Sequence, residues 1–106
     1  MSRRPRRRYL HLAIESEQLV TEEDVTNSIW SALLRLFGEY GTSHVNLTLI
    51  EYSRQRNYAI VRCSHKALGM VRASITSIIE INGKPSAIHV VAVSGTLKAL
   101  RRKAAM

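Results

Sequence analysis

Hydrophobic and polar residues alternate along three stretches of the chain, which is the pattern of half-buried β-strands. The stretches are residues 9–15 (YLHLAIE), 45–52 (VNLTLIEY) and 58–64 (YAIVRCS). Only the polar turn 53–57 (SRQRN) separates the last two, so they are predicted to form a hairpin. Residues 86–93 (SAIHVVAV) are almost continuously apolar, as expected of a strand covered on both faces or nearly so. The pattern therefore predicts four strands.

Apolar residues at helical spacing predict a first helix that begins near residue 21. Residues 21–24 (TEED) fit a capping box, in which Thr21 is the N-cap and Asp24 reaches back to it. The apolar stripe that follows consists of Val25, Ile29, Leu33, Leu36 and Phe37, with Trp30 alongside. Gly38 and Gly41 suit the left-handed residue at a helix end, so the helix is expected to end there.

A second helix and a short third one are predicted in the remaining sequence. Ser64 can cap the second helix, whose apolar stripe extends through Ile79. The Asn82-Gly83 pair then stops this helix and starts a turn. After the last strand, Thr96 can cap a short basic helix that runs through Lys103.

This order of elements predicts an α+β fold of the ferredoxin-like (split βαβ, RRM-like) type. Such a βαββαβ sandwich has a four-stranded antiparallel sheet with two helices on one face. The other face is left to a partner or to the short C-terminal helix. The length of 106 residues fits one domain, which is expected at 9–103 and is preceded by a flexible basic arm at 1–8.

The net charge of +8 is concentrated at the two ends of the chain. The basic residues there are Arg3, Arg4, Arg6, Arg7 and Arg8, and Lys98, Arg101, Arg102 and Lys103. Residues 9–97 hold seven Lys or Arg against eight Asp or Glu, which leaves a net charge of −1. Basic ends of this kind favour a nucleic-acid partner, because each neutralised phosphate releases condensed counterions. An anionic membrane surface, an acidic protein and plain solubilising tails remain alternatives.

The sequence gives little support to a catalytic, metal-binding or membrane-spanning protein. Its four histidines and its single cysteine, Cys63, lack the paired spacing of structural zinc sites. No nucleophile has a recognisable base and oxyanion hole, and no glycine-rich phosphate loop is present. One cysteine indicates a reducing compartment, and no apolar run approaches the ~20 residues of a membrane span. We expect a cytoplasmic protein with no bound metal or cofactor and no active site of its own.

RNA binding is better supported than catalysis. Basic side chains could bind RNA phosphates, and the sheet face without helices could bind bases or a protein. The candidate phosphate-binding residues are Arg4, Arg6, Arg7, Arg8, Arg62, Lys66, Arg72, Lys98, Arg101, Arg102 and Lys103. Lys98, Arg101 and Arg102 share one helical face by their spacing. Tyr9, His11, Tyr58 and Ile60 fall on the sheet face opposite the helices. Residues 58–64 lack the aromatic RNA-binding pattern of RRM domains, which favours a protein interface at these four over base stacking.

Six phrases of the chain together resemble the archaeal-type ribonuclease P protein component 2, a family with eukaryotic relatives in ribonuclease P and in a ribosomal-RNA processing enzyme. They are Arg8-Tyr9-Leu10, Leu36-Phe37-Gly38-Glu39-Tyr40-Gly41, Ile60-Val61-Arg62-Cys63, Val71-Arg72-Ala73, Ile81-Asn82-Gly83 and Val93-Ser94-Gly95-Thr96-Leu97-Lys98-Ala99-Leu100. They occur in the family's order over residues 8–103. No single phrase is a catalytic signature.

The resemblance implies a subunit of the ribonucleoprotein that removes the 5′ leader from precursor tRNA. In that enzyme the RNA holds the active site and the magnesium ions. The resemblance also implies pairing with protein component 3, in an assembly with two copies of each, beside other protein subunits. RNA contact would then fall on Arg8, Arg62, Arg72, Lys98, Arg101 and Arg102. A stand-alone RNA-binding module, a small enzyme and a dimerisation domain remain alternatives.

Overall fold

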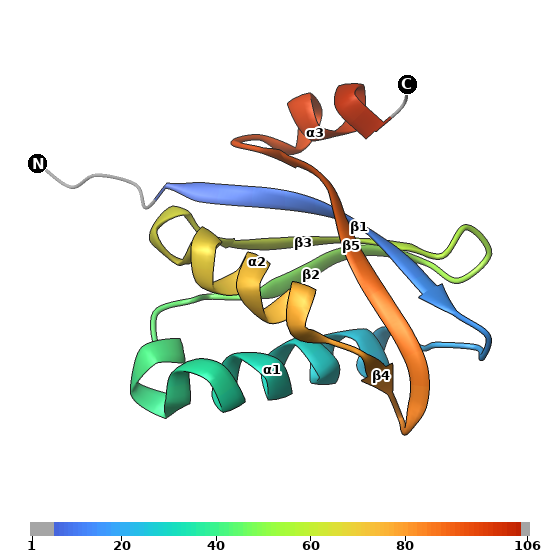
Figure 1. The fold of residues 1–106 in the computed structure, drawn as a ribbon. Helices are drawn as coiled ribbons and strands as arrows, with labels where there is room; N and C mark the ends of the chain where they lie inside the picture. The colour runs from blue at the N-terminus through green and yellow to red at the C-terminus, as the bar shows by residue number, and fades with distance from the viewer. Residues whose placement is uncertain (1–5, 105–106) are drawn as a thin grey trace, which may run out of the picture.

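The computed structural model describes residues 6–104, in which two helices cover one face of an antiparallel sheet and a third lies on the other face (Figure 1). The elements are β1 (Arg7–Ser16), α1 (Glu22–Thr42), β2 (Thr48–Ser53), β3 (Tyr58–Ser64), a 3-10 turn (His65–Ala67), α2 (Leu68–Ser77), β4 (Glu80–Ile81), β5 (Lys84–Ser94) and α3 (Leu97–Ala104). The strand order is β2-β3-β1-β5-β4. Apart from the short β4, this is the split βαβ arrangement, so the predicted ferredoxin-like α+β fold is confirmed.

The sheet has five strands where four were predicted, because a two-residue strand precedes β5. The second helix was expected to continue through Ile79, but α2 ends at Ser77. The chain then enters β4, which pairs with the start of β5. Between them Asn82 and Gly83 both have positive φ, at 54° and 77°, as a type I′ hairpin turn requires. The turn was predicted, but a strand of two residues has no period to detect.

The N-terminal end of α1 follows the predicted capping chemistry, but its C-terminal end does not. The Thr21 hydroxyl accepts a hydrogen bond from the Asp24 backbone, and the Asp24 carboxylate accepts one from the Thr21 backbone, which confirms the capping box. Gly38 adopts φ 72°, so it is the expected left-handed residue. One more helical turn follows it up to Thr42, whose hydroxyl donates to the Gly38 carbonyl at 3.0 Å. The helix is therefore kinked at Gly38 rather than ended there.

Three other element boundaries differ from prediction in ways that a tertiary contact explains. β1 begins at Arg7, within the expected arm, because that residue pairs with Ser64 of β3. β2 begins at Thr48 rather than at 45, after a loop that is bonded to the end of β3. Ser64 does not cap α2; its hydroxyl donates to the His44 carbonyl at 3.0 Å, and a 3-10 turn precedes the helix.

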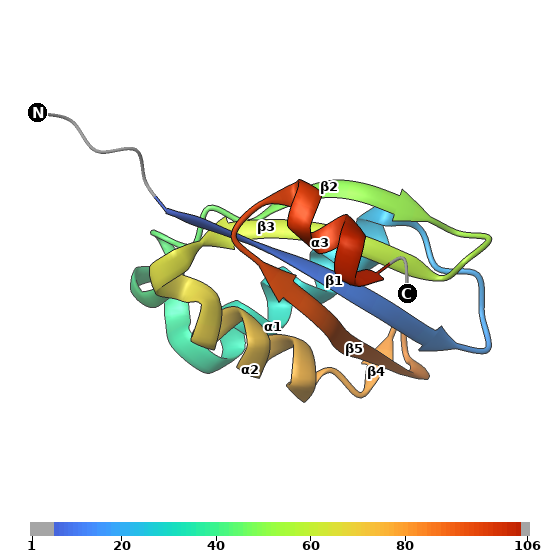
Figure 2. The same ribbon diagram turned by 90° about the horizontal axis from the view of Figure 1, so that it is seen from above.

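The main core lies between the sheet and the pair α1 and α2. Its most buried side chains include Leu10 and Leu12 of β1, Ile29 and Leu33 of α1, and Val71 and Ile75 of α2. Ile60 and Leu100 are also buried but do not belong to this cluster. Leu100 belongs to α3, which packs against β1 and β5 on the other face of the sheet (Figure 2). Ile60 of β3 lies opposite His11 of β1 on that same face. The C-terminal helix therefore covers part of the face that the α1 and α2 layer leaves open.

Candidate nucleic-acid interface

Basic residues gather at one end of the sheet, where β1 starts and where β3 and β5 end. The pairing of Arg7 with Ser64 and of Tyr9 with Ser94 fixes this alignment. The backbone N–H of His65 also donates to the Arg6 carbonyl at 2.8 Å, which brings the 3-10 turn beside the start of β1. The residues of this basic end are Arg6, Arg7, Arg8, Arg62, Lys66 and Lys98. The fold thus joins basic residues from three separate parts of the chain.

Six of the eight acidic residues occupy the opposite end. They are Glu15, Glu17, Glu22, Glu23, Asp24 and Glu80. Glu15 pairs with Ala87 near the start of β5, and the Gln18 amide donates to the Ile81 carbonyl at 2.5 Å. These contacts bring the end of β1 and the segment before α1 next to the β4–β5 hairpin. Arg54, Arg56 and Lys84 also lie at this end, so the acidic residues outnumber the basic ones there by six to three. Net charge is therefore separated along the strands.

The Arg8 side chain makes one hydrogen bond to the neighbouring backbone and lies close to one glycine. Its guanidinium donates to the Arg7 carbonyl at 3.0 Å. The same group lies so close to Gly95 that a Cβ atom there would be 3.3 Å from Nη1. Glycine at 95 therefore leaves room for Arg8 beside the turn that leads into α3.

The four basic residues of α3 have different surroundings. Arg101 donates to a Glu51 carboxylate oxygen at 2.9 Å, and the Lys103 ammonium donates to the Val93 carbonyl at 2.8 Å. These two contacts hold α3 on the sheet. Lys98 and Arg102 are exposed, and their side chains form no hydrogen bond or ion pair with residues 6–104. Lys98 and Arg102 are therefore the two predicted phosphate-binding residues of α3 whose charge has no acidic partner in the described part of the protein.

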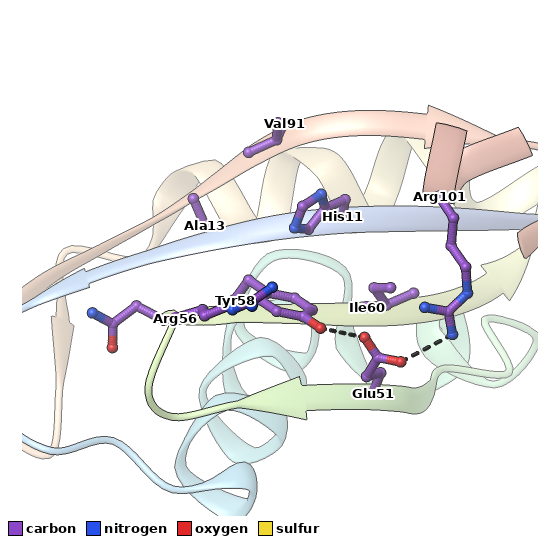
Figure 3. Close-up of a pocket in the computed structure, with 9 residues that line it drawn as sticks. His11, Ala13, Glu51, Arg56, Tyr58, Ile60, Val91 and Arg101 are labelled. Atoms are coloured by element: carbon purple, nitrogen blue, oxygen red, sulfur yellow. Dashed lines mark hydrogen bonds and ion pairs between the residues drawn. The ribbon is translucent and has the colours of Figure 1, made fainter. Parts of the chain in front are cut away.

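Glu51 connects α3 to the sheet through two neighbours (Figure 3). The hydrogen bond from the Tyr58 hydroxyl, and next the one from Arg101, lowers the pKa of Glu51 below its ordinary value. The same bond to Glu51 raises the pKa of Tyr58. The Tyr58 ring packs edge-on against His11, with ring centroids 5.1 Å apart. Burial lowers the pKa of His11, whose Nδ1 atom has no partner in the described residues.

The four residues predicted as a protein interface all lie on the α3 side of the sheet. His11, Tyr58 and Ile60 line a hollow of about 520 Å³ together with Glu51 and Arg101. Ile60 is only 3% exposed, so it packs beneath this face and offers almost no surface to a partner. Tyr9 is partly buried opposite Arg62. A partner that approached this face would meet the rim of the hollow rather than an open flat sheet.

Two predicted phosphate-binding residues do not belong to the basic end or to α3. Arg72 is exposed on α2, and Arg4 lies outside the described residues. Within 6–104, no three His, Cys, Asp or Glu side chains gather in a way that could hold a metal ion. Cys63 is 1% exposed, and burial raises the pKa of its thiol to about 11. No helix among these residues is long and apolar enough to cross a membrane.

One apolar surface was not anticipated. Leu36 and Phe37 were predicted to belong to the buried stripe of α1, but they are 46% and 38% exposed. Leu34 and Tyr40 are exposed beside them in sequence. The prediction was wrong here because helical periodicity gives the direction of a side chain, not how far the covering layer extends.

Comparison with known proteins agrees with the fold and with the resemblance. The model of the Rpp14/Pop5 family matches residues 8–105. Ribonuclease P protein component 2 of Pyrococcus furiosus is 35% identical over 100 residues, which cover 94% of this chain and 83% of that protein. Its counterpart from Methanosarcina mazei is 31% identical over 102 residues, covering 96% and 86%. A chain in the cryo-EM structure of yeast Ribonuclease MRP shares the fold with a TM-score of 0.74 at 19% identity, covering 92% of this chain and 79% of that one. The family predicted from the sequence is confirmed: this chain belongs to the Rpp14/Pop5 family.

Proposed function

We propose that this chain is a non-catalytic protein subunit of ribonuclease P, the ribonucleoprotein that removes the 5′ leader from precursor tRNA. The RNA of that enzyme would carry the active site and its magnesium ions, and this chain would bind and stabilise the RNA's catalytic domain. The observation that carries the proposal is the basic end, built from three segments of a chain whose relatives are named as component 2. Densely packed RNA phosphates would be neutralised there.

The protein partner in this proposal is component 3, in a cytoplasmic assembly with two copies of each protein, alongside other protein subunits. If the basic end binds RNA, that surface is not available to component 3. The hollow around Tyr58 and His11, and the exposed apolar end of α1, are the surfaces left for it. Both carry aromatic side chains, which are enriched in protein interfaces.

Reconstitution tests the proposal. Precursor-tRNA cleavage by the cognate catalytic RNA is measured with and without this chain and component 3, over a magnesium titration. The expected result is cleavage at low magnesium that requires this chain, and no cleavage by the proteins without RNA. If omission changes nothing at any magnesium concentration, the chain is not a functional subunit of that enzyme. RNA binding that persists in that case would favour the stand-alone RNA-binding alternative.

A further inference from the structure

Arg7 and Arg62 line one hollow on the α3 side of the sheet, at its basic end. Arg62 pairs with Tyr9, and Arg7 pairs with Ser64, so the two arginines are diagonal neighbours on adjacent strands. Diagonal neighbours lie roughly 7–8 Å apart, within reach of long side chains. The hollow measures about 370 Å³ and is lined by Arg7, Asn46, Leu47, Thr48, Arg62, Cys63 and Ser64. We refer to it as the Arg7–Arg62 hollow.

The two guanidinium groups have no counter-charge in the part of the chain that the structure describes. Neither forms a hydrogen bond or an ion pair with any side chain in residues 6–104, and no acidic residue lines the hollow. Arg62 is also partly buried, so water screens its charge less than that of a fully exposed arginine. Arg101, by contrast, has Glu51 at 2.9 Å. Two like charges brought together without an acid between them suit an anionic ligand.

The wall of the hollow formed by the loop before β2 is fixed. The Ser64 backbone N–H donates to the Val45 carbonyl at 2.9 Å, and its hydroxyl donates to the His44 carbonyl at 3.0 Å. Asn46 then turns the chain with a φ of 52°. Thr48 follows in β2, directly opposite Arg62. The backbone that carries Asn46 and Thr48 is therefore in place before any ligand arrives, which reduces the entropy lost on binding.

We propose that the Arg7–Arg62 hollow binds one phosphodiester of a single RNA strand. The proposal rests on the RNA binding put forward above and names the group bound and the residues that hold it. The two guanidiniums would donate to the phosphate oxygens, as arginine does in forked contacts. The Thr48 hydroxyl and the Asn46 amide can each donate and accept, which matches the 2′-hydroxyl of the adjoining ribose. The site therefore reads the sugar-phosphate backbone rather than base sequence.

Binding of a short fluorescein-labelled oligouridylate, followed by anisotropy over a salt titration, tests the site. Arg7→Gln and Arg62→Gln should each weaken binding by about tenfold, since each removes hydrogen bonds between charged groups. Each should also lower the slope of log affinity against log salt by about 0.7, as expected for one lost contact with single-stranded nucleic acid. Arg56→Gln is the matched control, because it removes the same charge from the β2–β3 turn at the opposite end.

Two further variants separate the parts of the site. Arg62→Lys keeps the positive charge but loses the forked pair of guanidinium N–H donors. Its affinity for the RNA should therefore lie between those of the wild type and Arg62→Gln. Thr48→Val should weaken binding of the RNA more than binding of the matching oligodeoxynucleotide. Equal melting temperatures would establish that each variant folds.

The outcomes distinguish the site from the function it serves. If wild type binds RNA but Arg7→Gln and Arg62→Gln behave like Arg56→Gln, the hollow is not the site and the subunit role is unaffected. If wild type fails to bind the oligonucleotide even at low salt while it supports precursor-tRNA cleavage, the hollow is equally excluded. If it fails in both assays, the proposed function fails with it.

Discussion

The guanidinium of Arg101 donates a hydrogen bond to Glu51 across the sheet, at 2.9 Å, and so joins α3 to β2. The same carboxylate accepts a hydrogen bond from Tyr58 of β3. One acidic side chain therefore connects three elements on the face opposite α1 and α2. Arg101 lies in the most basic segment of the C-terminal half. Its charge is already paired with Glu51, so it is less available to RNA than an unpaired arginine.

The interaction between Glu51 and Arg101 should be measurable in a double-mutant cycle of Glu51→Gln and Arg101→Gln. Their side chains are 30% and 53% exposed, so we expect a coupling free energy of up to about 1 kcal/mol. The measurement is urea unfolding of the wild type, the two single variants and the double variant. The pair of Glu15 and His89, 78% and 58% exposed, is the control and should show weaker coupling. Equal coupling in the two pairs would contradict a special role for Glu51.

Acid should weaken the same contact. Because the pKa of Glu51 is lowered in the folded protein, its contribution to stability is fully present above the ordinary pKa of 4.5 and is lost as the pH falls through the lower, folded-state value. Melting temperatures followed from neutral pH to well below 4.5 should therefore fall less steeply in Glu51→Gln than in wild type. Tyr58→Phe removes the largest cause of the shift and should also flatten this acid limb. An unchanged limb in both variants would contradict the assignment.

Two glycines should respond to alanine with opposite signs. Gly83 has a φ of 77° in the β4–β5 turn, so Gly83→Ala should destabilise the protein by about 1–2 kcal/mol. Gly69 lies in α2 with open space around it and without a positive φ, so Gly69→Ala should stabilise by up to about 1 kcal/mol. Thermal and urea unfolding of both variants checks this. Stabilisation by Gly83→Ala would show that the turn does not require its left-handed residue, and destabilisation by Gly69→Ala would show that α2 does not gain from alanine at that position.

Leu100 should anchor α3 without supporting the main core. It is fully buried but lies outside the cluster that contains Leu33. Leu33→Ala should cost about 2–5 kcal/mol of unfolding free energy. Leu100→Ala should cost less than about 2 kcal/mol globally, because a terminal helix can detach while the rest stays folded. Hydrogen exchange should then speed up in α3 and remain slow in β1; uniform acceleration throughout would show that α3 belongs to the single cooperative unit.

Most of the fold could be predicted because its signals are local. The Thr21–Asp24 capping box and the Asn82-Gly83 turn each depend on neighbouring residues, and the structure contains both. The exposure of Leu36 and Phe37 could not be predicted in the same way. Their spacing matches the buried stripe, but burial depends on whether another layer reaches that end of α1.

The candidate site was predictable only as a list of residues. The positions of the basic residues in the sequence placed the excess positive charge at the chain termini. The convergence of Arg7 with Arg62 depends on the register of β1 against β3, and a shift of one residue would turn one side chain to the other face. The pairing of Arg101 with Glu51 joins positions 50 residues apart, and no local sequence pattern predicts such a contact.

The separation of charge along the strands has a consequence for how the protein meets a polyanion. β5 contains 11 residues, so the acidic and basic ends are roughly 35 Å apart. That distance is several times the Debye length of about 8 Å at physiological ionic strength. The carboxylates of one end therefore scarcely repel phosphates bound at the other. At low ionic strength screening is weaker, and the field of the RNA would rotate the molecule as an electric dipole so that it arrives with its basic end foremost.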